Sequence, residues 1–165
     1  MKRVFFILFF ALITFVSCYF KTTDKALDYY EEIVTKRMNQ LVTNYEMALI
    51  DSFENYNPEE MQSAYDALEK KVLELEKDFN GMKDYYGDTS LIDNAKELIS
   101  AYKKALPLYA EKIAIESLSD DAYTDAEAEK STALMDEINE LLNPLNDKFI
   151  ESTEVFAAAN GFELY

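Results

Sequence analysis

The sequence of 165 residues contains 32 acidic and 16 basic side chains, no histidine and a single cysteine. Its formal charge of −16 argues against nucleic-acid binding, because that interaction needs cations to neutralise the phosphates. The missing histidine excludes Ser-His-Asp and Cys-His catalysis and most zinc sites, and the single cysteine excludes a disulfide within the chain.

The chain begins with a short cationic segment and a long apolar run. Two basic residues at positions 2–3 precede an uncharged stretch, residues 4–16, which Ser17 and Cys18 close. This order is typical of a secretory signal peptide, and the stretch is shorter than the about 20 apolar residues that a membrane-spanning helix needs. Because the uncharged run can be extended to Phe20, an uncleaved membrane anchor is the alternative.

The end of this run, FVSC at residues 15–18, resembles the lipobox of bacterial lipoproteins, although Phe15 replaces the usual leucine. The resemblance implies a signal peptide at residues 1–17 and acylation, as by palmitate, of the Cys18 thiol, since two or more acyl chains anchor a protein stably to a membrane. The alternative is an ordinary signal peptide that happens to be followed by cysteine. Tyr19 stands where an aspartate would favour the inner membrane, so we expect an outer-membrane or cell-surface location in the bacterial envelope.

Cleavage before Cys18 would leave 14 basic and 32 acidic side chains, a formal charge of −18. Anionic lipid would repel such a chain, so the acyl chains must supply the membrane binding. Residues 18–23 are predicted to form the lipidated tether, with a reach of roughly 17 Å beyond the cysteine. Residues 24–165 are predicted to form one helical domain.

A first helix is predicted from Asp24 to the turn ENYNPEE at residues 54–60. Apolar residues recur along it with near-heptad spacing, which indicates one buried face. The predicted stripe contains Leu27, Tyr30, Val34, Leu41, Tyr45 and Ala48, with Met38 one position out of frame.

A second helix is predicted to begin with Asn57 as its N-cap and Pro58 as its first residue, a strong start signal. Its end is predicted at Asn80-Gly81. The spacing of its apolar residues alternates between four and three, as expected for a helix with one buried face: Met61, Tyr65, Leu68, Val72, Leu75 and Phe79.

A third helix is predicted to open near Ser90, which with Asp93 resembles a capping box, and Asp88 and Thr89 are competing caps. The fourth is predicted to open at Thr124 in a second capping box. The third stripe is Leu91, Ala95, Leu98, Tyr102, Leu106, Tyr109 and Ile113, and the fourth is Leu134, Ile138, Leu141, Leu145, Phe149, Phe156 and Ala159.

Pro107 and Pro144 fall inside these two helices, where a proline usually kinks or breaks the helix. The apolar spacing stays in phase across both, which favours kinked continuous helices. A break with a restart at Pro144 is the alternative, because Asn143-Pro144 repeats the cap signal of Asn57-Pro58. Four long amphipathic helices with short connections predict an all-α, up-down-up-down four-helix bundle.

The loop KDYYGDTS is the predicted contact site for a protein partner with a basic surface, through Asp84, Tyr85, Tyr86 and Asp88. Adjacent aromatic residues beside carboxylates suit such a contact, since aromatic residues are common in interfaces. The alternative is that this segment is only a helix-capping turn.

We expect no catalytic residue, no cofactor and no metal site. The acidic runs at residues 84–88 and 120–125 lack the spacing of a calcium-binding loop. Two alternatives to a binding module remain open. One is a small-ligand carrier with a tyrosine-lined interior, and the other is an envelope hydrolase that uses a pair of carboxylates.

Three segments resemble blocks in a family of small, uncharacterised helical surface lipoproteins of bacteria: DYYEEIVTKRMNQL, GDTSLIDNAKELISAY and EVFAAANGFEL. The resemblance covers most of the chain after Cys18 and rests on structural motifs, and Pro107 and Pro144 depart from the family pattern. It implies a helical bundle at the cell surface and transfers no catalytic residue. The whole sequence therefore predicts a membrane-tethered acidic bundle that acts as a binding or structural module.

Overall fold

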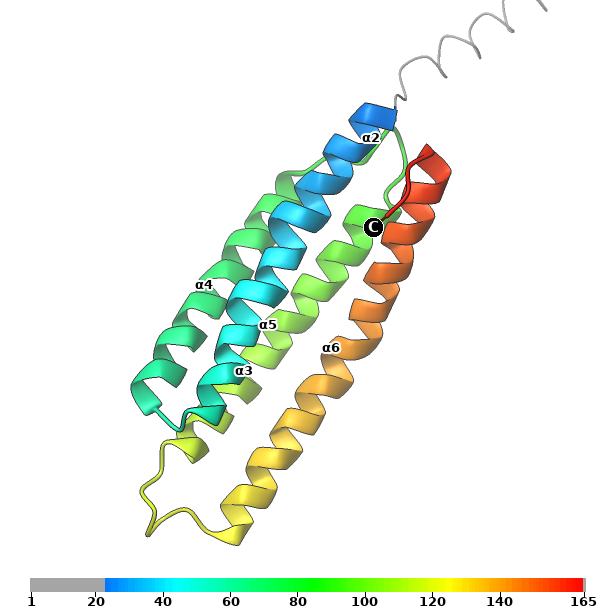
Figure 1. Ribbon diagram of the computed structural model, residues 1–165. Coiled ribbons are helices and arrows are strands. Elements are labelled where there is room, and N and C mark those ends of the chain that lie inside the picture. The colour runs from blue at the N-terminus through cyan, green and yellow to red at the C-terminus, as the bar shows by residue number, and fades with distance from the viewer. Residues whose placement is uncertain (1–22, 165) are drawn as a thin grey trace, which may run out of the picture.

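The computed structural model describes residues 23–164, which form four long helices in an up-down-up-down bundle (Figure 1). The first helix consists of α2 (Thr23–Tyr30), η1 (Glu31–Met38), η2 (Leu41–Glu46) and α3 (Met47–Glu54). The other three are α4 (Pro58–Gly81), α5 (Ser90–Glu116) and α6 (Asp125–Asn160). The predicted all-α four-helix bundle is confirmed. The predicted lipidation site, Cys18, lies outside the described residues.

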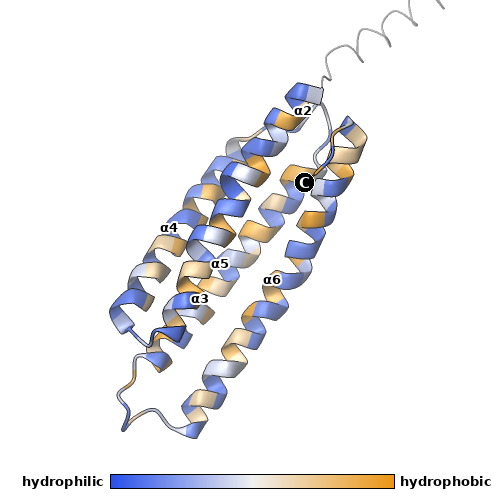
Figure 2. Ribbon diagram, in the orientation of Figure 1, coloured by the Kyte–Doolittle hydropathy of each residue, from blue (hydrophilic) through white to orange (hydrophobic). Residues whose placement is uncertain are grey.

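Hydrophobic and hydrophilic residues recur along each helix (Figure 2), and the core is made mainly of apolar side chains from all four helices. Five of the six residues of the predicted α4 stripe are buried, and Tyr65 is only partly buried; the buried ones are Met61, Leu68, Val72, Leu75 and Phe79. All seven residues of the predicted α5 stripe are also buried. These two helices confirm that a regular 3.6-residue period predicts the buried face correctly.

The predicted buried face of the first helix is wrong at both ends. Leu27 is 38% exposed and Ala48 is exposed, whereas their neighbours Ala26 and Leu49 are fully buried. The reason is that η1 and η2 are π-helical, with hydrogen bonds from residue i+5 to residue i, so each turn contains more residues than an α-helical turn. A near-heptad frame therefore loses register along this helix.

The start signals of α4 and α6 are confirmed. The Asn57 side chain accepts the backbone N–H groups of Glu59 and Glu60 at 3.0 and 3.4 Å, and the Thr124 side chain accepts that of Glu127 at 3.4 Å. In α5 the cap is different, because the Asp88 carboxylate accepts from both the backbone and the hydroxyl of Ser90, at 3.0 and 2.7 Å. Asp88 thus stabilises the first turn of α5.

Both internal prolines lie inside continuous helices, as predicted, so the alternative of a break with a restart at Pro144 does not occur. Pro107 and Pro144 are exposed, and the carbonyl that each leaves without a helical partner can bind water. The predicted α6 stripe needs two corrections: Leu142 is buried rather than Leu141, and Ala159 is exposed. The exchange of Leu141 for Leu142 is a shift of the buried face by one residue.

The two ends of the bundle contain different segments. One end, here called the Thr23 end, holds Thr23, the loop of residues 82–89 and residues 161–164. The opposite end holds the turn between α3 and α4 and the loop between α5 and α6. With 36 residues, α6 is about 54 Å long, so the two ends lie far apart.

Candidate functional site

The loop at the Thr23 end forms a tight turn over residues 85–88. The backbone N–H of Tyr85 donates to the carbonyl of Asp88, and that of Asp88 donates back to Tyr85, both at 3.0 Å. Tyr86 and Gly87 have φ angles of +52° and +89°, the pattern of a type I′ turn. The Asp84 carboxylate accepts the N–H of Gly87 at 2.7 Å. Both aspartates of the predicted contact site therefore stabilise the turn and the start of α5.

The structure places the two tyrosines of this predicted site in different environments. Tyr85 is 4% exposed, with its ring centroid 5.4 Å from those of Tyr29 and Phe156, so little of its side chain is accessible to a partner and its contact stays a prediction. Its ring packs against aromatic rings of the first helix and of α6. Tyr86 is 54% exposed, and its partner contact stays a prediction.

Two shallow cavities lie on either side of Tyr86. One, of about 520 Å³, runs between the loop and the start of α5, and the other, of about 470 Å³, runs between the loop and the first helix. Lysines line both of them, including Lys83 and Lys96 in the first and Lys25 and Lys36 in the second. The surface around the predicted loop is thus of mixed charge, which does not select for a basic partner.

A half-buried carboxylate in the middle of the bundle binds two buried tyrosines. Tyr102 and Tyr109 of α5 donate their hydroxyls to Glu46 at 2.5 and 3.1 Å, and the two side chains are 3% and 1% exposed. Both hydroxyls are therefore satisfied by one anion from the first helix. This cluster links the first helix to α5 through charge-assisted hydrogen bonds, which are stronger than neutral ones.

Sequence reasoning missed Glu46 because its heptad position predicts an exposed residue. Glu46 is the last residue of the π-helical segment η2, whose wider turn rotates the side chain towards α5. The signal in the sequence was the pair of tyrosines in the predicted α5 stripe, Tyr102 and Tyr109. A buried tyrosine hydroxyl usually needs a hydrogen-bond partner, and here that partner could only come from another helix.

This cluster predicts that the bundle loses stability above pH 10. Burial, followed by the charge of Glu46, raises the pKa of Tyr102 and Tyr109 well above the ordinary value. The unfolded chain releases these protons near pH 10 while the folded chain keeps them, so their stabilisation is complete below about pH 10 and is lost as the pH rises. The loss is about 1.4 kcal/mol per tyrosine per pH unit.

Urea unfolding at about pH 9 and about pH 11 should therefore differ by about 3 kcal/mol in the free energy of unfolding. Tyr29, whose pKa burial and nearby aspartates raise to about 12, adds to this loss. The double variant Y102F/Y109F serves as the comparison, and its stability should fall less between the two pH values. An equal fall in both proteins would contradict the prediction.

At the end opposite Thr23, a buried ion pair joins three helices. Lys112 Nζ lies 2.9 Å from Glu116 Oε1, and both side chains are about one-tenth exposed. Ser131 of α6 is hydrogen-bonded to both, and the Lys112 ammonium lies 4.8 Å from the ring centroid of Phe53 in α3. Burial raises the pKa of Glu116, but the hydrogen bonds from Ser131 and Lys112 outweigh it and keep the pKa below its ordinary value. The Glu116 carboxylate is thus ionised and held in place.

A pocket of about 360 Å³ lies beside this ion pair. It forms where the turn before α4, the end of α5 and the following loop meet. The lining residues are Tyr56, Pro58, Glu116, Leu118, Asp120 and Tyr123. Tyr56 is 75% exposed. Burial, followed by the charge of Glu116, raises the pKa of Tyr123.

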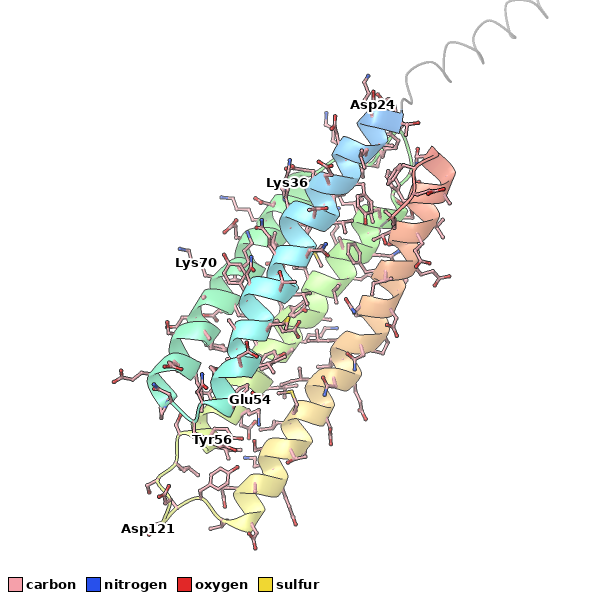
Figure 3. The ribbon with its side chains drawn as sticks, in the orientation of Figure 1. Asp24, Lys36, Glu54, Tyr56, Lys70 and Asp121 are labelled. Atoms are coloured by element: carbon pink, nitrogen blue, oxygen red, sulfur yellow. The ribbon has the colours of Figure 1, made fainter. Side chains whose placement is uncertain are left out.

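Acidic side chains are concentrated around this pocket. We call residues 51–66 and 111–130 the acidic tip. They contain twelve carboxylates and two lysines, which gives them a formal charge of −10. The formal charge of all described residues, 23–164, is −19, so the acidic tip holds about half of it. Both lysines are in ion pairs, Lys112 with Glu116 and Lys130 with Glu111 at 2.6 Å. Figure 3 shows two tip residues, Tyr56 and Asp121, at the end of the bundle opposite Asp24. The tip is therefore a strongly anionic surface with a pocket in it.

Residues 23–164 contain no group of three or more aspartate or glutamate side chains placed to hold a metal ion. None of the helices within that range combines the length and the apolar character that crossing a bilayer requires.

Comparison of the chain with protein-family models, with curated proteins and with solved structures found no match.

Proposed function

We propose that the protein is a bacterial cell-envelope lipoprotein, held at an outer membrane or cell surface by acyl chains on Cys18, and that its helical bundle is a non-catalytic binding module for a protein partner with a basic surface. The strongest support is that the start of the bundle at Thr23 and the acidic tip lie at opposite ends of the bundle. The predicted attachment point lies five residues before Thr23, and the acidic tip lies at the other end of the bundle.

This arrangement suits a tethered binding module. Residues 19–22 allow only a short reach, so attachment at Cys18 would keep the Thr23 end near the membrane and leave the acidic tip about 50 Å away from it. There the tip would be accessible to partners and far from the anionic lipid headgroups that would repel it. Clustered carboxylates accelerate the encounter with a basic surface and favour it over other surfaces.

The two alternative functions have less support. A carboxylate-dependent hydrolase needs two carboxyl groups facing one cleft, one of which must hold a proton. Glu116 and Asp120 both line the tip pocket, but Glu116 is paired with Lys112 and its pKa lies below the ordinary value, so it does not suit the role of general acid. The other partly buried carboxylate, Glu46, is bound by two tyrosines. Glu116 also lies two helical turns beyond Tyr109, one of the two tyrosines that bind Glu46, which is about 10 Å along α5. A carrier would need a cavity lined by several tyrosines. The cavity of about 290 Å³ between the first helix and α6 has one tyrosine, Tyr30, among its lining residues.

Replacing Cys18 with serine is expected to remove the protein from the membrane fraction and to abolish acyl-chain labelling, because serine offers no thiol for acylation. The measurement is metabolic labelling with a palmitate analogue together with membrane fractionation in a bacterial host. The matched control is Ser17→Ala, which keeps a small residue before the cysteine and should remain labelled and membrane-bound. A C18S protein that stays in the membrane would refute the lipid anchor and favour an uncleaved apolar helix.

A further inference from the structure

The pocket in the acidic tip has the composition of a site for an organic cation. We propose that it receives an arginine or lysine side chain of the protein partner, which makes it the specific contact within the binding surface proposed above. The inference rests on that proposed function and adds a residue-level site to it. The predicted site at residues 84–88 is not part of it, since that loop lies at the Thr23 end.

The walls and the rim of the pocket supply different interactions. Tyr56 and Tyr123 offer aromatic faces, and a cation over such a face is attracted by the negative charge of the π system. Pro58 and Leu118 offer apolar surface, which suits the methylene stem of a long basic side chain. The pocket can therefore hold both the stem and the head of such a side chain.

The two carboxylates of the pocket have different roles. The Glu116 carboxylate is already neutralised by Lys112 and held by Ser131, so it supplies a fixed acceptor with little net charge. Asp120 is exposed and is in no ion pair within the described residues. We therefore assign the charge pairing with the incoming cation to Asp120.

The surroundings of the pocket favour a protein partner. The acidic tip extends beyond the pocket over the ends of all four helices, and its lysines are already paired within it. A single small cation would leave this charge without a partner, whereas a basic protein surface would complement it over a wide area. The pocket then fixes the position of one basic side chain within a broader electrostatic contact.

The test measures binding of a fluorescein-labelled peptide with several Arg-Gly-Ser repeats to the full-length protein in neutral detergent, by fluorescence anisotropy. Two variants alter the pocket: Asp120→Asn removes its free charge, and Tyr56→Asn removes an aromatic wall while tolerating the φ of +50° found there. We expect each to weaken binding about tenfold, a typical loss for one charge-assisted or cation–π contact.

Each variant has a matched control. Asp121→Asn removes the same charge from the next residue, which does not line the pocket. Leu73→Asn replaces an exposed large apolar side chain in α4 that does not line the pocket. Both controls should change the affinity by no more than about twofold.

Two results would overturn the inference. If D120N and D121N weaken binding equally and Y56N leaves it unchanged, the peptide responds to total charge alone, which refutes the pocket but leaves the binding module intact. If the unaltered protein does not bind the peptide even at low salt, both the pocket and the basic-partner proposal are refuted. Selective loss in D120N and Y56N, together with weaker binding at higher salt, is the result that supports the pocket.

Discussion

Replacing Glu46 with alanine is expected to lower the free energy of unfolding by about 3 kcal/mol. The change removes the acceptor of the Tyr102 and Tyr109 hydroxyls, which lie 2.5 and 3.1 Å from its carboxylate oxygens. Both tyrosines are buried, so their hydroxyls would lose a strong acceptor without gaining water. Hydrogen bonds to a charged group contribute about 1.5–3 kcal/mol each, and an unsatisfied buried donor costs a similar amount.

The measurement is urea unfolding of the variant and the unaltered protein at neutral pH. Glu46→Gln keeps a neutral acceptor and should lose roughly half as much stability, because hydrogen bonds to neutral groups are weaker. Glu31→Ala is the matched control, since it removes an exposed glutamate from the same helix and should change stability by less than about 0.5 kcal/mol. Equal effects of E46A and E31A would show that the cluster does not stabilise the bundle.

The second large effect is expected from Phe156→Ala, which should cost about 3–5 kcal/mol. Phe156 is 1% exposed and lies at the centre of the aromatic cluster at the Thr23 end. Its ring centroid is 5.8 Å from that of Tyr29, 5.4 Å from that of Tyr85 and 6.3 Å from that of Phe162. Truncation would leave a cavity among groups from the first helix, the loop of residues 82–89 and the C-terminal segment.

This variant also has a local consequence. Because Tyr85 packs on Phe156, the turn of residues 85–88 should open more often, and amide hydrogen exchange at Tyr85 and Asp88 should accelerate more than exchange in α4. Val155→Ala is the control, since Val155 is 58% exposed and should change stability by less than about 0.5 kcal/mol. Unchanged exchange in the turn of F156A would show that the loop is held by other contacts.

The sequence determined the features that depend on local chemistry. The N-caps of α4 and α6 follow from side chains that bind backbone N–H groups within three residues, and the buried faces of α4 and α5 follow from a regular helical period. The apolar spacing stays in phase across Pro107 and Pro144, and it therefore also predicted that α5 and α6 continue through these prolines. The lipid anchor on Cys18 is a prediction of the sequence that lies outside the described residues.

Tertiary structure decided the features that require distant segments to meet. The π-helical turns of the first helix change its register, and they bring Glu46 to the tyrosines of α5. Tyr85 and Tyr86 are adjacent and chemically identical. Which of them is buried depends on aromatic residues far away in the sequence, because Tyr85 packs against Tyr29 and Phe156.

The pocket of the acidic tip likewise combines residues far apart in the sequence, such as Tyr56 and Tyr123. Local patterns carry no information about these neighbours, because hydrogen-bond and packing partners separated by more than a few turns are set by the arrangement of the helices. The sequence therefore predicts the bundle and its attachment, and the folded structure locates the surface that we expect to bind a partner.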